Sequence, residues 1–195
     1  MHHRVKNNLQ IISSLLMHQS EYIKDKNMID VFIDSQNRIA SMSLIHEKLY
    51  RSKDLSKIDF KEYIIDLVAN LFQSCGVNAG NIVLDTDIEN TLLDIDFAIP
   101  CGLIINELAT NSLKYAFPPG VKGEIKIAFQ STDGNMFKLV VSDNGIGLPK
   151  DLDFKKTESL GLHLVTVLAE NQLHGEINLN RNKGTEFQIK FKGIK

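Results

Sequence analysis

The feature that most constrains the fold is an apolar strand pattern that runs directly into a glycine-spaced loop. Residues 136–141 are mostly apolar and end in two valines, which predicts a strand. Asp143 follows at the strand tip, and Gly145 and Gly147 stand where side chains would block the close approach of a ligand. A carboxylate here can accept hydrogen bonds from an amino group such as that of adenine. The D-N-G sequence is also typical of a hairpin turn, so the motif alone leaves both interpretations open.

The N-terminal part of the chain carries a second pattern, the apolar spacing of two paired helices. Apolar residues recur at heptad spacing in two stretches that are separated by the polar run 24–27. The first seam contains Val5, Leu9, Ile12, Leu16 and Ile23, and the second contains Met28, Phe32, Ile39, Met42 and Leu49. The pattern predicts a helical hairpin, which a second copy would complete as a four-helix bundle. The alternative is a hairpin that packs on its own second domain.

Polar and basic residues gather at the head of the first helix, where the helix dipole favours acidic ones. A solvated helix end or a purification tag would explain the histidines, although a tag would not continue into a heptad. The functional interpretation is a reactive imidazole, because neutral histidine has a free ring nitrogen at about pH 7. Extending the heptad backwards places His2 in the seam and His3 beside it, with Asn7 one turn further on. His3 is therefore the predicted nucleophile.

The rest of the chain alternates helix and strand patterns after a mostly polar stretch, residues 53–58, interpreted as a linker. Helices are predicted over 60–74, 95–115 and 160–173, and strands over 82–88, 124–130, 137–141, 175–180 and 185–191. Pro100 is expected in the first turn of its helix, where proline is tolerated. This order predicts a mixed sheet with helices on one face. The predicted fold class is α+β, with the hairpin at 1–52 and an α/β sandwich at 53–195.

Composition and charge exclude several classes of function. Hydrophobic residues make up 43% of the 195 residues and charged ones 24%, which is ordinary for a globular protein. The net charge of -2 gives no general attraction to nucleic acid or membranes. No apolar run approaches the roughly 18 residues of a membrane-spanning helix. Cys75 and Cys101 lack metal-type spacing and are interpreted as buried thiols in a reducing compartment.

Further segments carry residue types suited to a nucleotide. In the helix at 95–115, four polar side chains fall on one stripe, namely Glu107, Asn111, Lys114 and Tyr115. Asn111 is either a core residue with a satisfied amide or a ligand of Mg²⁺, which accepts one protein carbonyl together with phosphates and water. Lys114 would then reach a phosphate. Each of these segments admits a purely structural explanation when it is taken alone.

The segment 150–159 is mostly polar and long enough to close over a nucleotide as a lid. Phe154 within it either latches this lid or belongs to the core. A helix then opens with amide groups suited to phosphate oxygens, at Leu160, Gly161 and Leu162. Thr185 opens the last strand and would place its hydroxyl near Asp143 or near a bridging water.

These motifs, in this order, resemble the transmitter region of a sensor histidine kinase. N-E-L-A-T-N-S-L-K-Y is similar to the N box of that family, D-N-G-I-G-L-P to its first glycine box, S-L-G-L to its second, and G-T-E-F to its last ATP-pocket strand. H-H-R-V-K-N-N-L-Q resembles the phosphoacceptor helix of a subgroup related to the HWE kinases, although the chain has no Trp. The resemblance covers nearly the whole chain. It implies the Bergerat ATP-binding fold of gyrase, joined to a dimerising hairpin.

The resemblance implies an ATP-dependent protein histidine kinase of a two-component system. His3 would attack the γ-phosphorus of ATP, and an aspartate of a response regulator would then take the phosphoryl group. Mg²⁺ would sit on Asn111. The implied ATP-binding residues are Asn111, Lys114, Tyr115, Asp143, Gly145, Ile146, Gly147, Leu160, Gly161, Leu162 and Thr185. The expected setting is a cytoplasmic homodimer that meets a receiver domain, with the sensor region outside this chain, which starts inside a helical pattern.

Two departures from the commonest family pattern bear on the mechanism. Ser159 stands where many of these kinases have another Gly, which would stiffen the lid. Arg4 stands where an acidic residue usually follows the phosphoacceptor, and arginine cannot accept the imidazole proton. Arg4 is suited to offset γ-phosphate charge, and Glu107 is one candidate for the proton acceptor. Asn7 is placed to orient the ring or, later, a water that removes the phosphoryl group. The rival classes are a gyrase-type ATPase clamp, an anti-sigma-type serine kinase and an inactive dimeric scaffold.

Overall fold

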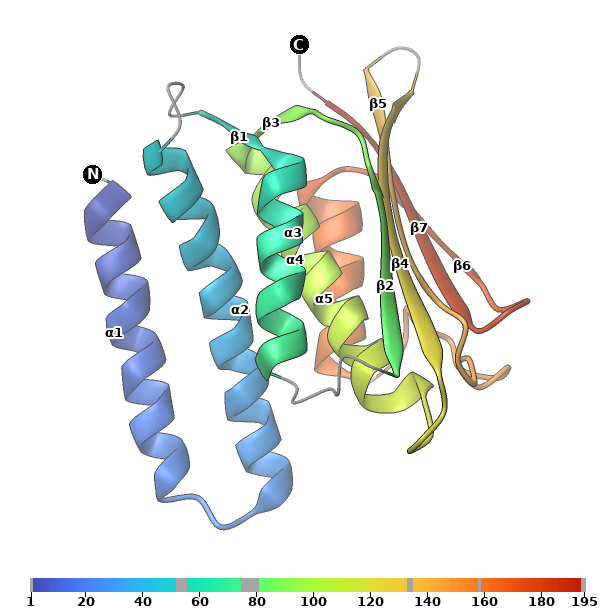
Figure 1. The fold of residues 1–195 in the computed structure, drawn as a ribbon, viewed down its shortest axis with the longest axis horizontal. Helices are drawn as coiled ribbons and strands as arrows, with labels where there is room; N and C mark the ends of the chain where they lie inside the picture. Colours follow the sequence, from blue (N-terminus) through green and yellow to red (C-terminus); the bar gives the residue numbers. More distant parts are fainter. Residues whose placement is uncertain (1, 52–55, 75–80, 133–134, 158, 194–195) are drawn as a thin grey trace.

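The structure is a computed structural model that describes residues 2–51, 56–74, 81–132, 135–157 and 159–193 (Figure 1). Within the helices, the side chains at positions 2–4, 6, 26, 27, 50 and 51 also lie outside this description. The chain forms a helical hairpin followed by a sheet that is covered by helices. The predicted α+β class is confirmed.

The hairpin consists of α1 (His2–Glu21) and α2 (Lys26–Arg51), which run antiparallel side by side (Figure 1). Asp25 precedes α2 and accepts a hydrogen bond from the backbone N–H of Met28, which satisfies a free amide of the first turn. Leu9 is half-buried, as its seam position predicts. Ile12 and Met28 are exposed in the single chain, because two helices cover only part of a bundle seam.

The second half of α2 is part of the main hydrophobic core. Ser41, Ile45 and Leu49 are buried, and the two apolar residues share one cluster with the helices of the second domain. The hydroxyl of Tyr63, on α3 (Phe60–Ser74), donates a hydrogen bond to the carbonyl of Ser41 at 3.5 Å. The alternative expected from the sequence, a hairpin packed on its own second domain, therefore holds for α2 in this structure.

The predicted linker is partly wrong, because it contains a strand. β1 (Lys57–Asp59) pairs antiparallel with β3 (Leu92–Asp94), a strand that the sequence patterns did not reveal. Ile58 is buried at the centre of β1 while its neighbours on either side are exposed. An alternation over three residues is too short to stand out in a sequence.

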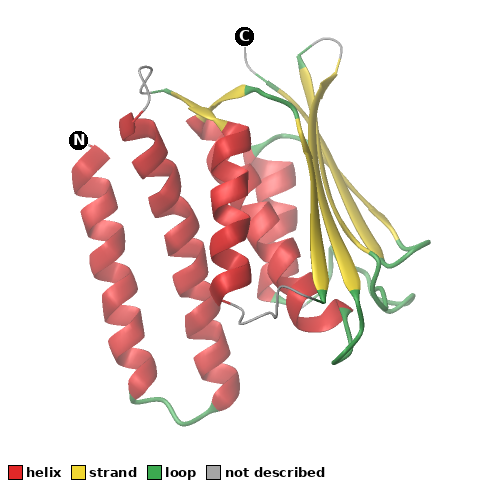
Figure 2. Ribbon diagram, in the orientation of Figure 1, coloured by secondary structure: helices red, strands yellow, loops and turns green. Residues whose placement is uncertain are grey.

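The large sheet is mixed, as predicted. Its strands lie in the order β2 (Ile82–Ile88), β4 (Gly123–Thr132), β5 (Met136–Asp143), β7 (Thr185–Lys192) and β6 (Glu176–Asn180). β2 and β4 are parallel and the other neighbours are antiparallel. The helices cover one face of this sheet (Figure 2). The register of β5 and β7 pairs Asp143 with Thr185, which brings two predicted site residues together.

Two helices of the covering layer carry the site. α4 (Ile95–Asn111) continues as the π-helical turn η1 (Ser112–Ala116), and α5 (Leu160–Val167) continues as η2 (Leu168–Gln172). Asp94 caps α4 by accepting a hydrogen bond from the N–H of Asp96. Pro100 thus lies beyond the first turn, contrary to the prediction, and the helix forgoes one hydrogen bond there.

Cys101 is a free thiol, and complete burial raises its pKa above the usual range, so the predicted buried thiol is found there. Cys75 lies outside the described residues. Among the helices that the structure describes, none is both long and apolar enough to cross a membrane.

Candidate nucleotide-binding site

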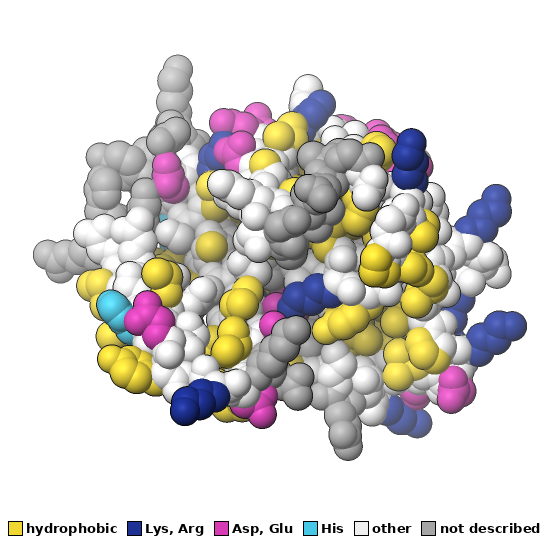
Figure 3. All heavy atoms as spheres, turned by 60° about the horizontal axis from the view of Figure 1, so that its bottom comes forward, with side chains coloured by type: hydrophobic (Ala, Val, Ile, Leu, Met, Phe, Trp, Pro, Cys, Tyr) yellow, Lys and Arg dark blue, Asp and Glu magenta, His cyan; other side chains and the backbone are white. Residues whose placement is uncertain are grey.

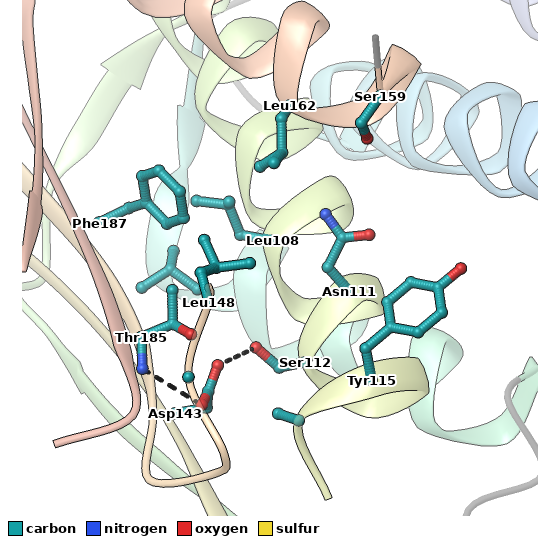
Figure 4. A pocket seen from close by; sticks show the side chains of 13 residues that line it. Leu108, Asn111, Ser112, Tyr115, Asp143, Leu148, Ser159, Leu162, Thr185 and Phe187 are labelled. Atoms are coloured by element: carbon teal, nitrogen blue, oxygen red, sulfur yellow. Dashed lines mark hydrogen bonds between the residues drawn. The ribbon is translucent and has the colours of Figure 1, made fainter. Parts of the chain in front are cut away.

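A pocket of about 220 Å³ lies between the sheet and the helices α4 and α5 (Figure 4). Its walls are mostly apolar, and polar groups stand at a few points around it. The lining residues are Leu108, Asn111, Ser112, Tyr115, Ala116, Val141, Asp143, Gly147, Leu148, Ser159, Leu162, Thr185 and Phe187. An apolar pocket with a few fixed polar groups is typical of a small-molecule or cofactor site.

Asp143 is the buried carboxylate of this pocket. Its Oδ1 accepts hydrogen bonds from the N–H groups of Gly145 at 3.0 Å and Thr185 at 3.3 Å. Its Oδ2 accepts a hydrogen bond from the Ser112 hydroxyl at 2.8 Å (Figure 4). These donors hold the carboxylate in one orientation. The contact from Thr185 comes from its backbone, whereas the sequence suggested its hydroxyl.

Close backbone approaches around Asp143 explain the glycines of the motif. A Cβ at Gly145 would lie 2.2 Å from the carbonyl oxygen of Ala116. A Cβ at Gly184 would lie 2.1 Å from the carbonyl oxygen of Asp143, and this residue has φ +80°. Gly147 also has a positive φ, +75°, and borders the pocket. The glycines therefore let three segments converge on the carboxylate.

Asn111 points into the pocket from the end of α4, opposite Leu162 and Ser159 (Figure 4). Tyr115 borders the same side one turn later and is largely exposed. Phe154, in the predicted lid, packs edge-on against Phe187 with ring centroids 5.4 Å apart. Phe154 also packs against the main core, which favours the second of its two interpretations.

Two predicted site residues contact the hairpin. Lys114 Nζ lies 2.6 Å from Asp34 Oδ1 on α2. Partial burial is the largest single influence on the pKa of Lys114 and lowers it, but the hydrogen bond to Asp34 and the nearby negative charges together outweigh burial, so the net pKa is raised. Glu107 accepts two hydrogen bonds from Arg38, at 2.7 Å from Nε and 2.7 Å from Nη2. These bonds raise the pKa of the Arg38 guanidinium.

The head of α1 lies far from the pocket. In Figure 1 the start of α1 stands at the same end of the molecule as the end of β4 and the start of β5. Asp143 ends β5 and therefore lies at the opposite end. The side chains of His3 and Arg4 lie outside the described residues, and Asn7 is exposed on α1. The predicted phosphoacceptor and ATP residues are thus not brought together in this arrangement.

The structure gathers a subset of the predicted ATP residues around one cavity. Those that line it are Asn111, Tyr115, Asp143, Gly147, Leu162 and Thr185. Ile146 and Leu160 are exposed and are not part of this lining. Ser112 and Arg38 were missed, because the contacts that mark them join segments far apart in the chain. Ser112 lies within the N-box motif, and this position was the available sequence signal that it belongs to the site.

Comparisons with known proteins match the two parts of the chain to two family models. Residues 1–75 match the family described as "Histidine kinase". Residues 98–193 match "Histidine kinase-, DNA gyrase B-, and HSP90-like ATPase". The sensor histidine kinase PdtaS of Mycobacterium tuberculosis is 30% identical over 193 residues, which cover 97% of this chain and 38% of the relative. The blue-light-activated histidine kinase 2 of Erythrobacter litoralis is 26% identical, over 92% of this chain and 51% of that relative.

Solved structures show the same fold. The histidine kinase domain of a blue-light-activated histidine kinase from Erythrobacter litoralis superimposes with a TM-score of 0.74 and 20% identity, over 95% of this chain and 94% of that domain. A longer structure of that kinase gives a TM-score of 0.72 and 24% identity, over 97% of this chain and 59% of its own.

The sheet, its covering helices and the pocket define an ATPase domain of the gyrase and HSP90 class. Joined to its helical hairpin, the chain belongs to the histidine kinases, as the sequence motifs predicted. The chain spans between 36% and 51% of the length of the curated relatives that it matches.

Proposed function

We propose that this chain is the transmitter region of an ATP-dependent protein histidine kinase. One observation carries the proposal: a pocket built around a buried, oriented carboxylate is joined to a hairpin whose first helix starts with histidines. A nitrogen of the His3 imidazole attacks the γ-phosphorus of ATP, forming a P–N bond as the bond to the ADP oxygen breaks. The second imidazole nitrogen gives up its proton after this step.

Asp143 is the group that selects the nucleotide. Its buried carboxylate accepts a hydrogen bond from the exocyclic amine of adenine, either directly or through a water. Apolar side chains such as Leu148, Leu162 and Phe187 provide the walls between which a flat ring fits. The donors on Asp143 keep it from turning away when the nucleotide leaves.

The donor set fits a Mg²⁺ ion that arrives with its nucleotide. Among the described residues there is no cluster of His, Cys, Asp and Glu that would hold a metal by itself. Asn111 lines the pocket, and its amide oxygen would supply one ligand, while phosphate oxygens and water would complete the oxygen shell that Mg²⁺ prefers. When bound, the ion offsets charge on the transferring phosphoryl group. Asn111 is the protein group that would hold the ion.

The described arrangement is that of a resting kinase. Phosphoryl transfer requires reacting atoms about 3–3.5 Å apart, whereas the head of α1 and the pocket occupy opposite ends of the molecule (Figure 1). Transfer within one chain would therefore require the nucleotide domain to move relative to α1. Glu107 is bound to Arg38 in this state, so its predicted role as proton acceptor requires the pair to open first.

The partners proposed are a second copy of the chain and a response regulator. α1 exposes Ile11, Ile12 and Leu15 in neighbouring turns, a face suited to a four-helix bundle. Apolar side chains also reach the surface at the end of the molecule that Figure 3 brings forward. The receiver domain of the regulator would dock on the hairpin near the phosphohistidine. The use of ATP supports a cytoplasmic setting.

Incubation of the chain with γ-labelled ATP and Mg²⁺ tests the proposal. We expect acid-labile, base-stable label on the wild type and on His2→Gln, and none on His3→Gln. Label retained in His3→Gln and lost in His2→Gln would move the site to His2. Released phosphate without protein label would indicate the ATPase clamp, and label on the serine of an added protein would indicate the anti-sigma class. Either of these last two outcomes overturns the kinase proposal.

A further inference from the structure

An arginine of the hairpin reaches into the nucleotide domain. Arg38, on α2, forms a two-bond ion pair with Glu107 on α4, from a distance of 69 residues along the chain. The exposed fractions of the two side chains are 16% and 7%. The geometry is the parallel, two-bond pairing that arginine makes with carboxylates. Losing one partner of a pair this well buried leaves an uncompensated buried charge, which is strongly unfavourable.

Glu107 stands at the side of the pocket that the triphosphate is expected to occupy. It lies one helical turn before Asn111, which lines the pocket. A Cβ on Gly161, at the start of α5, would come within 2.8 Å of Glu107 Oε2 and 3.8 Å of the Asn111 amide nitrogen. The carboxylate therefore lies between the two elements whose amides and side chains were predicted to hold phosphates.

A bare carboxylate at this place would oppose nucleotide binding. The triphosphate of ATP carries several negative charges, and like charges repel strongly where water is scarce. Asn106 donates one hydrogen bond to Glu107 Oε1 at 3.2 Å, but an amide carries no net charge. The compensating positive charge comes from Arg38, a residue of the hairpin.

Arg38 is held in place by the packing of its helix. Ser41 lies one turn later, is buried, and accepts the hydrogen bond from Tyr63. Ile45 and Leu49 continue the same face into the core. The guanidinium is therefore presented to Glu107 by a rigid element and has little freedom to lose when it forms the pair.

We infer that Arg38 is a positioning residue of the nucleotide site, which neutralises Glu107 and so admits the triphosphate. The inference rests on the proposed binding of ATP in this pocket. It makes the hairpin a contributor to nucleotide affinity in addition to its role as phosphoacceptor. Arg38 acts through Glu107 and need not touch the nucleotide itself.

Calorimetric titration of Mg²⁺–ATP into charge variants of the whole chain tests the inference. We expect Arg38→Gln to weaken ATP affinity on the order of tenfold, because it leaves Glu107 unpaired beside the phosphates. Arg38→Gln combined with Glu107→Gln should restore affinity to within about threefold of the wild type, since both charges are then gone. Arg38→Lys should lie between wild type and Arg38→Gln, because it keeps the charge and loses the paired geometry.

Lys48 supplies the matched control. It also lies on α2 and forms ion pairs with the nucleotide domain, at 2.6 Å to Glu62 and 2.5 Å to Asp66 of α3. Both partners lie outside the pocket lining. Lys48→Gln should therefore leave ATP affinity unchanged while it loosens the same helix. A loss equal to that of Arg38→Gln would show that any weakening of α2 lowers affinity and would overturn the inference.

Two further outcomes separate this inference from the proposed function. Wild-type chain that binds no ATP contradicts the assignment of the pocket itself, and the inference fails with it. Wild-type chain that binds ATP, with Arg38→Gln equally tight, overturns the role of Arg38 alone. Equal weakness of Arg38→Gln and the double variant also overturns it, because that pattern indicates a structural role without charge compensation.

Discussion

Lys114 donates a hydrogen bond to Asp34 of α2 at 2.6 Å, so a lysine predicted to contact phosphate is held by the hairpin. Along α4 and η1, Lys114 lies two turns from Glu107. Glu107 in turn is bound by Arg38, which lies on α2 as Asp34 does. One carboxylate and one cation of the predicted nucleotide site are thus both engaged by α2. In the proposed site, the hairpin would compete with ATP for Lys114, whereas it would assist ATP binding at Glu107.

Removing this competition should strengthen nucleotide binding. In Asp34→Asn, Lys114 loses its charged partner and is free to approach a phosphate, so we expect ATP affinity to rise about two- to fivefold, the range of a partly exposed ion pair. Calorimetric titration of Mg²⁺–ATP measures the change. Asp66→Asn is the control, since it removes a different carboxylate that pairs with α2 through Lys48. Affinity that is unchanged or lower in Asp34→Asn would show that Lys114 does not serve the nucleotide.

Asp143→Asn should abolish tight ATP binding and leave the fold intact. The substituted amide keeps an oxygen for the N–H groups of Gly145 and Thr185, and the Ser112 hydroxyl can accept from its nitrogen. The adenine amine loses a charged acceptor, which corresponds to about tenfold to a hundredfold in affinity.

Calorimetry measures this affinity, and a thermal melt monitored by circular dichroism checks the fold. The control is Asp85→Asn, at a carboxylate on β2 that pairs with Lys126 away from the pocket. If Asp143→Asn binds ATP as tightly as the wild type, the pocket has been assigned to the wrong ligand.

Much of the fold was predictable because its elements carry local patterns. Helix 60–74 and strand 82–88 agree with the predicted bounds, since apolar spacing and turn residues define both. β1 and β3 escaped notice because three residues give no periodicity. Heptad spacing placed Ile12 in a seam but does not say which helix covers it, and in the single chain Ile12 is exposed.

The candidate site also has a part that could be predicted from the sequence and a part that could not. Asp143 and its glycines were recognisable, since a strand that ends in a spaced-glycine loop is a contiguous motif. The pair Arg38–Glu107 could not be predicted, because it depends on how α2 packs against α4. Long-range ion pairs leave no spacing in a single sequence, and they emerge only when the tertiary arrangement is known.

Asn111→Ala should lower Mg²⁺-dependent autophosphorylation more than it lowers the affinity for the nucleotide. Asn111 would supply one oxygen ligand of the ion, and phosphates and water would supply the others. Most contacts between the nucleotide and the pocket would therefore be unchanged. We expect autophosphorylation to fall at least about tenfold, with ATP affinity in the absence of Mg²⁺ nearly unchanged. Titrations with and without Mg²⁺, beside rates of label incorporation, separate the two effects. Full activity at ordinary Mg²⁺ would show that Asn111 is a packing residue.

Ile12→Asp should convert a homodimer into monomers. Ile12 is 46% exposed on α1, although it belongs to the predicted heptad seam, so a second copy is the expected cover for it. A carboxylate buried in that interface without a partner would cost far more than the exposed isoleucine contributes to the single chain. Leu9 is half-buried within the hairpin, so Ile12 is the cleaner position for the test.

Light scattering after size-exclusion chromatography gives the mass of each variant. Ile65→Asp provides a matched control, because Ile65 is also 46% exposed but lies on α3, away from the proposed interface. We expect the wild type and Ile65→Asp to have the mass of two chains and Ile12→Asp that of one. Ile12→Asp that keeps the mass of two chains would place the interface elsewhere. A wild type with the mass of one chain would contradict the predicted homodimer.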